Sequence, residues 1–187
     1  PKQRARMIGL LNQAGLLITP TEFTRNAIAE WWPAFAQGAL RYTPVKVVRW
    51  SGELPAISPD LSKEEKPLDL PNGPYFLSVG AMEARKNYGL VLRAMENMAA
   101  DGWTYLIVGG TKGATAAELA TIARLCASGW AIKIHARISE ENLRRLTENA
   151  AFLIHPALAE GFGLPPLEAI RLGTPALVSD ALAHLEL

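Results

Sequence analysis

The sequence predicts an α/β fold built on a parallel β-sheet. From residue 74 onward, short apolar runs alternate with segments of helical character, and each gap between two runs has room for one helix. Strands that alternate with helices in this way form βαβ units, in which successive strands run parallel. An apolar run, a glycine-containing turn and a helix follow one another at residues 151–172, as in doubly wound sheets that bind phosphates. We therefore predict a Rossmann-like doubly wound parallel sheet for the second part of the chain.

The first 73 residues have a less regular pattern. Their predicted elements are a helix over 2–14, a strand over 16–19, a helix that starts within 19–22 and ends at Trp32 before Pro33, and a strand over 45–50. Residues 51–73 are rich in Pro, Gly, Ser and charged residues, which is typical of a linker. The predicted units are residues 1–54 as the tail of a preceding domain with its crossover, 55–73 as the linker and 74–187 as the sheet domain.

The sheet domain is expected to contain five strands and four helices. The strands are predicted over 75–79, 104–108, 132–135, 151–154 and 175–178, and the helices over 88–99, 115–127, 139–149 and 167–172. A doubly wound domain usually closes with more helix, so we expect the C-terminal end of this domain to be missing after Leu187. The chain also starts at Pro1 without an initiator Met, which suggests a piece of a longer protein.

Composition and charge exclude several classes of protein. The 187 residues suffice for one full domain, or one domain and part of another, and the net charge of +1 argues against a nucleic-acid partner. The single cysteine, Cys126, permits no disulfide within the chain and no zinc cluster. We interpret it as a small core residue in a reducing compartment, which favours a cytoplasmic location. No apolar run approaches the length of a membrane span.

Ligands of doubly wound sheets bind beyond the carboxyl ends of the strands, and three loops are expected there. Residues 80–87 include the adjacent cations Arg85 and Lys86, which are either solvated surface charges or ligands of a phosphate. Residues 109–113 form a glycine-rich turn that matches neither a Walker loop nor the GxGxxG fingerprint. This second turn is either a tight connection or a point of close approach to a ligand.

The third loop, residues 156–165, precedes a helix. Backbone N–H groups at such a helix start, with the helix dipole, suit an anion such as phosphate. Two carboxylates, Glu160 and Glu168, bracket the turn. Glu160 has an alternative interpretation as a surface acid, Glu168 as an acid that complements the helix dipole, and Phe162 as a core residue.

Four segments together resemble the retaining glycosyltransferases of family 4, the group 1 glycosyltransferases, which have the two-domain GT-B fold. Residues 160–168, EGFGLPPLE, are similar to the EX7E signature of that family. Residues 75–87 resemble its first C-terminal-domain strand and PRKN loop, with Ala84 in place of the usual Pro. Residues 134–143 and 173–179 are similar to two further family segments. The resemblance implies the tail of an acceptor domain followed by most of the C-terminal, donor-binding domain.

The resemblance also implies a reaction. It implies transfer of a hexose from a GDP- or UDP-linked sugar to an acceptor hydroxyl with retention, in polysaccharide or glycan biosynthesis of the cell envelope. Arg85 and Lys86 would meet the charge that develops on the leaving diphosphate, and Glu160 would contact hydroxyls of the donor sugar. The substrate-binding residues expected from the loops and the family likeness are Gly80, Gly109, Arg137, Ile138, Gly161, Phe162, Gly163, Leu164 and Glu168, with Glu168 on the ribose.

The sequence contains no Asp-X-Asp motif, so we expect neither a metal nor a cofactor besides the donor. The family implies a glycan or lipid-linked acceptor and peripheral membrane association through an N-terminal domain. The acceptor-side residues are not located in this sequence, so we expect the fragment alone to be inactive. The three histidines are interpreted as structural. Two alternatives stay open: a GT-B-fold sugar-nucleotide 2-epimerase, and a non-catalytic nucleotide-sugar-binding or scaffold domain.

Overall fold

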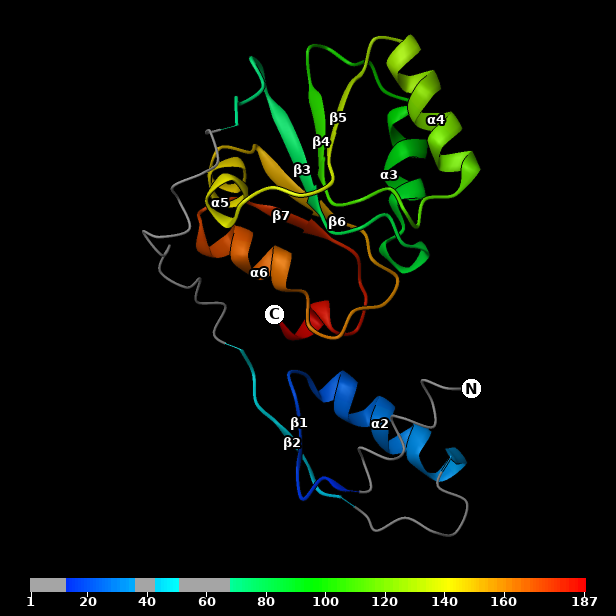
Figure 1. Cartoon of the computed structure of the whole chain (residues 1–187), viewed down its shortest axis with the longest axis vertical. Coiled ribbons are helices and arrows are strands. Elements are labelled where there is room, and N and C mark those ends of the chain that lie inside the picture. The colour runs from blue at the N-terminus through cyan, green and yellow to red at the C-terminus, as the bar shows by residue number, and fades with distance from the viewer. Residues whose placement is uncertain (1–12, 36–42, 51–67) are drawn as a thin grey trace.

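The computed structural model describes residues 13–35, 43–50 and 68–187, and only the backbone of residues 31–35. Most of the predicted helix over 2–14 and most of the predicted linker lie outside the described residues. Figure 1 shows a small N-terminal segment beneath a larger sheet domain. In the N-terminal segment, strands β1 (Leu17–Thr19) and β2 (Val45–Val47) pair in parallel, and helix α2 (Glu22–Phe35) lies between them in sequence.

Helix α2 runs past the predicted end at Trp32 and continues to Phe35. Pro33 removes its own backbone hydrogen bond to residue i−4, but only two residues follow it before the helix ends. The prediction that Pro33 ends the helix is therefore wrong by three residues.

The sheet domain contains the five predicted strands. They are β3 (Tyr75–Val79), β4 (Thr104–Val108), β5 (Ala131–His135), β6 (Phe152–His155) and β7 (Ala176–Val178). Their order in the sheet is β5-β4-β3-β6-β7, and all four pairings are parallel. This arrangement confirms the predicted doubly wound parallel sheet.

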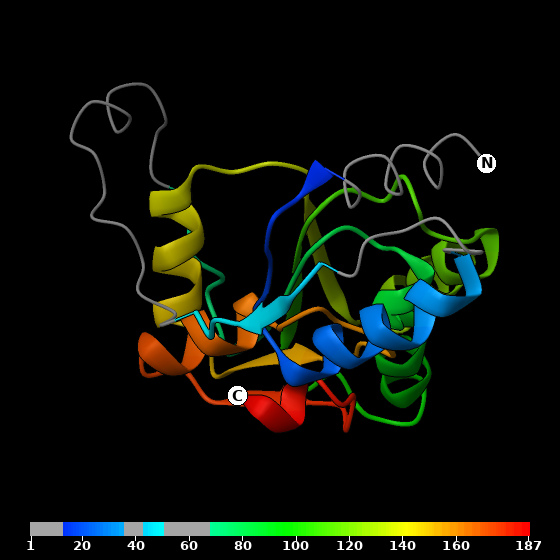
Figure 2. The same ribbon diagram turned by 90° about the horizontal axis from the view of Figure 1, so that it is seen from below.

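Helices cover both faces of this sheet, as Figures 1 and 2 show. Helices α3 (Tyr88–Met95) and α4 (Ala116–Ala127) lie on one face, and α5 (Glu140–Glu148) and α6 (Leu164–Arg171) lie on the other. Two short 3-10 turns, η1 (Ala84–Lys86) and η2 (His184–Glu186), complete the domain. The four helices agree in number and order with the prediction.

Successive side chains of β3 point to opposite faces of the sheet and contribute to a hydrophobic core on each face. Phe76 packs with the α3 side and stacks between Tyr105 and Phe152, with ring centroids 4.5 and 5.2 Å apart. Its neighbour Leu77 is fully buried on the opposite face, with residues of α5 and α6. A buried side chain of this size stabilises the fold by about 1.5–3 kcal/mol, so the centre of the sheet is the stable scaffold for the loops at its ends.

Helix starts follow local capping rules. Thr115 and Glu118 form a reciprocal capping box at the start of α4, and the Ser139 hydroxyl accepts the N–H of Asn142 at the start of α5. Helix α6 begins at Leu164, three residues earlier than predicted, because Pro165 and Pro166 occupy its first turn. Prolines are well tolerated there, since the first-turn N–H groups have no partner within the helix.

The interpretation of Cys126 as a core residue is wrong, because its side chain is exposed on α4. The preceding residue, Leu125, is buried in the core. Successive residues of an α-helix point about 100° apart, so the two side chains do not both face the sheet.

Among the described residues, no helix is both long and apolar enough to span a bilayer.

The turn after β4 approaches the turn after β3 too closely for a side chain. A Cβ atom added to Gly109 would lie 2.1 Å from the carbonyl oxygen of Gly80. We expect Gly109→Ala to lower the free energy of unfolding by about 2 kcal/mol, since backbone must shift to admit the methyl group. Gly102→Ala is the matched control: Gly102 also has a positive φ, +78°, but no atom lies within 4 Å of the added Cβ, so only about 1 kcal/mol is expected. Urea unfolding measures both, and equal losses would contradict the steric explanation.

Candidate functional site

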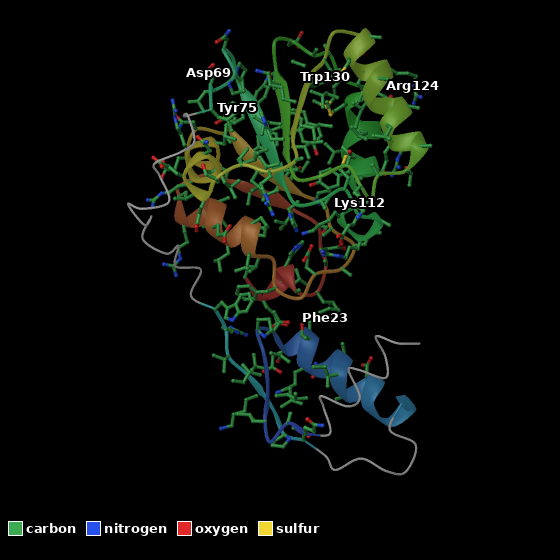
Figure 3. The ribbon with its side chains drawn as sticks, in the orientation of Figure 1. Phe23, Asp69, Tyr75, Lys112, Arg124 and Trp130 are labelled. Carbon is green, nitrogen blue, oxygen red and sulfur yellow. The ribbon has the colours of Figure 1, made fainter. Side chains whose placement is uncertain are left out.

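The candidate site lies where the strand order changes direction. From β3 the chain proceeds to β4 on one side, and it later returns to β6 on the other side of β3. In open α/β sheets a crevice forms at this point beyond the carboxyl ends of the two strands. Figure 3 shows this end of the domain facing the N-terminal segment around Phe23, whereas Tyr75 marks the opposite, amino end of β3.

Backbone hydrogen bonds join the loops that leave these strands. The Leu158 N–H donates to the Arg85 carbonyl at 2.8 Å and links the loops after β3 and β6. The Met82 N–H donates to the Gly110 carbonyl at 2.9 Å and links the loops after β3 and β4. The three loops therefore form one connected rim around the crevice.

The loop after β3 holds its two cations on a short turn. The hydroxyl of Tyr88 donates to the carbonyl of Gly80 at 2.6 Å and secures the beginning of this loop. Arg85 and Lys86 lie in the 3-10 turn η1. Asn87 then adopts a left-handed conformation (φ 55°), which Asn tolerates better than most residues, and starts α3.

Both cations contact the carboxylate of Glu160. Lys86 Nζ lies 2.6 Å and Arg85 Nη1 lies 2.9 Å from Glu160 Oε1. The side chains of Lys86 and Glu160 are nearly buried, whereas half of the Arg85 side chain is exposed. Arg85 also pairs with the exposed Glu83, at 3.0 Å. The structure thus brings together the three residues predicted to be catalytic, although Arg85 and Glu160 are 75 positions apart in sequence.

A histidine belongs to the same cluster. His155 ends β6, is buried, and places Nε2 3.3 Å from Glu160 Oε1 and 3.4 Å from Lys86 Nζ. The interpretation of the histidines as structural did not predict these contacts of His155 with Glu160 and Lys86. The available signal was its place at the carboxyl end of a strand, five residues before Glu160.

Burial and charge act in opposite directions on the ionisable groups. Burial by itself would raise the pKa of Glu160, but hydrogen bonds from His155 and Lys86 and the charge of Lys86 outweigh it and lower this pKa to about 2. Burial lowers the pKa of His155, which keeps the imidazole neutral near pH 7 despite its hydrogen bond to Glu160. The cluster therefore contains an ionised carboxylate, two cations and a neutral imidazole.

The loop after β6 ends at the N-terminus of α6. Gly163 is the residue before the helix and has φ 96°, a conformation that favours glycine. Leu164 is the first helical residue, and Gly161 is exposed in the loop. Phe162 is buried, and its ring meets the edge of Trp50 at 5.6 Å between centroids. Backbone N–H groups at such a helix start, near two cations, can bind a dianion.

Glu168 lies apart from this cluster, in a cavity of about 330 Å³ between α5 and α6. Ile138 lines the same cavity, whereas Arg137 is exposed and is not among its lining residues. Burial raises the pKa of Glu168, and the nearby charge of Glu140 raises it further. The cavity walls include Val79 at the end of β3, so this cavity reaches the carboxyl end of that strand.

Gly80 and Gly109 pack against each other at the rim, so closely that Gly109 has no room for a side chain. Across the described ranges, no group of three or more His, Cys, Asp or Glu side chains is arranged to hold a metal ion.

Comparisons with known proteins concern the family and the fold. A family model described as “Glycosyl transferases group 1” matches residues 61–187. The chain is 29% identical over 188 residues to O-antigen chain mannosyltransferase B of Escherichia coli, covering 96% of this chain and 48% of that protein. It is 31% identical over 106 residues to O-antigen chain mannosyltransferase RfbU of Salmonella typhimurium, covering 57% of this chain and 30% of that protein.

A solved structure with the same fold is that of HepE from Anabaena in complex with UDP and glucose. The TM-score is 0.69 at 22% sequence identity, and the match covers 99% of this chain and 50% of that one. The chain therefore spans about half or less of the length of these relatives.

Proposed function

We infer that this chain, which belongs to the group 1 glycosyltransferase family, holds the donor site of an enzyme that transfers a hexose from a nucleotide-diphosphate sugar to an acceptor hydroxyl. The observation that carries this proposal is the convergence of Arg85 and Lys86 on Glu160 beside the start of α6. A retaining outcome and a glycan or lipid-linked acceptor are parts of the same proposal.

The cations and the helix start are suited to the leaving group. Negative charge grows on the diphosphate as the glycosidic bond breaks, and preorganised donors lower the barrier to that step. Arg85 offers a planar fork for two phosphate oxygens, and Lys86 offers a compact point charge. The other partner of Arg85, Glu83, is exposed, and exposed ion pairs are weak, so the Arg85 side chain can turn to a ligand at little cost. These charges and the helix dipole would neutralise the diphosphate without a metal.

Glu160 has two roles in this proposal. Its ionised carboxylate holds both cations at the crevice, and its second oxygen can accept a hydroxyl of the donor sugar. His155 supports the carboxylate from the sheet side.

The cavity around Glu168 is suited to the nucleoside. Its volume of about 330 Å³ is within the usual range for a small-molecule site. Glu168 would accept the ribose hydroxyls, and the backbone near Ile138 would contact the base.

The names of the relatives suggest the sugar and the pathway. Both curated relatives are named O-antigen chain mannosyltransferases, so mannose is the first hexose that we propose, for a cell-envelope polysaccharide. Both GDP- and UDP-linked donors are to be tested. The HepE structure contains UDP, so a mannose donor linked to GDP is not the only candidate. We propose a cytoplasmic enzyme whose remaining domain supplies the acceptor site and membrane association, and this chain alone would bind donor without turnover.

Binding of nucleotides tests the proposal directly. We expect UDP or GDP at 100 times its Kd to raise the free energy of unfolding by about 2.7 kcal/mol, which corresponds to a Tm increase of about 5–10 °C for a chain of this size. Uridine and guanosine are the controls, since they lack the diphosphate that Arg85 and Lys86 would bind. Thermal unfolding and calorimetric titration measure the effect. If UDP, GDP, ADP and their hexose conjugates all leave Tm unchanged, the proposed donor site is wrong.

A further inference from the structure

Residues of the N-terminal segment bind the loop that carries Glu160. The hydroxyls of Thr21 and Thr24 donate to the carbonyl of Gly161, at 2.7 and 3.0 Å. These residues are 140 and 137 positions away from Gly161 in sequence. Thr21 is fully buried, and its hydroxyl also lies 2.9 Å from the hydroxyl of Thr24 and accepts the N–H of Thr24 at 3.1 Å. The two hydrogen bonds thus fix the carbonyl of Gly161 at one orientation.

That orientation determines where the next N–H group points. In a trans peptide the carbonyl of one residue and the N–H of the next point in opposite directions. With the Gly161 carbonyl directed at Thr21 and Thr24, the N–H of Phe162 is directed away from α2. Glycine permits many backbone conformations, and the loop has Gly161 before Phe162 and Gly163 after it. The two glycines leave this peptide less restrained than other residues would, so the two hydroxyls add a restraint to the one that burial of the Phe162 ring supplies.

A second set of contacts joins the same two parts of the molecule. The carboxylate of Glu186 accepts the N–H groups of Glu22 and Phe23, at 2.9 and 2.8 Å, from across the boundary. These are first-turn donors of α2 that no residue of the helix itself can satisfy. Figure 2 shows η2, which contains Glu186, beside the beginning of α2.

The turn η2 also contacts the site loop. A Cβ atom added to Gly163 would lie 3.0 Å from the ring of His184, so the imidazole packs directly on the residue that precedes α6. One short turn therefore contacts the start of α2 through Glu186 and the start of α6 through His184.

We propose that Thr21, Thr24 and Glu186 are positioning residues that couple the docking of α2 to the affinity for a nucleoside diphosphate. This inference rests on the proposed function, since the ligand is the donor nucleotide. The N–H groups of the 161–164 loop and of the α6 start bind the diphosphate best when α2 holds the Gly161 carbonyl. Because such coupling is reciprocal, a bound nucleoside diphosphate also strengthens the docking of α2.

The test compares hydroxyl-deleting with hydroxyl-retaining variants. Thr21→Val with Thr24→Val should weaken UDP or GDP binding about tenfold, the effect expected from the loss of two neutral hydrogen bonds. Thr21→Ser with Thr24→Ser should restore the Kd to within about twofold, because serine keeps the hydroxyl. Thr24→Val alone, which leaves the α2 cap at Thr21 in place, should weaken binding about threefold. Thr121→Val on α4 is the matched control, since its hydroxyl bonds only within or beside its own helix, and no change is expected.

Hydrogen exchange provides a readout of the reciprocal effect. UDP or GDP should slow exchange of the Glu22 and Phe23 amides in the unchanged chain, and should do so less in Glu186→Gln, whose side-chain amide has only one oxygen that can accept them. Binding of nucleotide with equal Kd to the unchanged chain and to the valine variants would overturn this inference and leave the donor site intact. Failure of the unchanged chain to bind any nucleoside diphosphate would overturn both.

Discussion

Replacing Arg85 and Lys86 together with alanine is expected to weaken UDP or GDP binding by about 100-fold. Hydrogen bonds to charged groups contribute about 1.5–3 kcal/mol each, so the loss of two amounts to about 3 kcal/mol, and each 1.4 kcal/mol is a factor of ten in Kd. Both side chains meet at one carboxylate in the loop before α6, and η1 contains no other cation that could replace them. Calorimetric titration of the chain with UDP and GDP measures the effect.

The matched control removes the same charge elsewhere. Arg124→Ala with Lys133→Ala deletes two exposed cations from α4 and β5, and it should change Kd by less than about twofold. Circular dichroism establishes that both double variants keep their helices and sheet. If nucleotide binds the Arg85 and Lys86 variant as tightly as the unchanged chain, the assignment of these cations to the diphosphate is wrong.

Acid is expected to weaken the fold through Glu160. The pKa of this group is about 2 in the folded protein, against the ordinary glutamate value of 4.5 expected in the unfolded chain, so the folded state favours the ionised form. The resulting stabilisation is complete above pH 4.5 and is lost as pH falls from 4.5 to 2. A difference of this size corresponds to about 3 kcal/mol in the free energy of unfolding.

Glu160→Gln isolates this contribution. Glutamine keeps the shape of the side chain but carries no charge to pair with Lys86, so the variant should be less stable at pH 7 by about 3 kcal/mol. The gap should narrow as the pH falls to about 2, where Glu160 becomes protonated and resembles the amide. Urea unfolding at a series of pH values provides the two curves. Parallel curves over the whole range would show that Glu160 does not titrate as the ion pair requires.

The sheet and its helices could be predicted because each strand is a compact apolar run with turn residues at its ends. Phe76 stacks between aromatic rings of the two neighbouring strands, which shows how such an apolar run is buried at the centre of the sheet. The meeting of Arg85 and Lys86 with Glu160 was expected from family likeness and from the rule that ligands bind beyond the carboxyl ends of strands. Sequence spacing alone would have left each of them as a surface charge.

Other parts of the site depend on contacts that no local pattern encodes. His155 ends an apolar strand as an ordinary buried histidine would, and only the folded loop brings Glu160 within reach of its ring. The hydrogen bonds of Thr21 and Thr24 to Gly161 depend on how two distant segments dock. Cys126 was placed in the core because its neighbours are apolar, whereas the helix turns its side chain outward.

The connected rim around the crevice is also a suitable frame for altering donor preference by design. Its joining hydrogen bonds, Leu158 to Arg85 and Met82 to Gly110, run between main-chain atoms. Any residue except proline keeps the donor N–H at Leu158, so the side chain there can be exchanged without removing the bond. Leu158 and Lys112 both have exposed side chains on this rim. A substitution library at these two positions would vary the chemistry presented to a sugar nucleotide while the loops keep their shape.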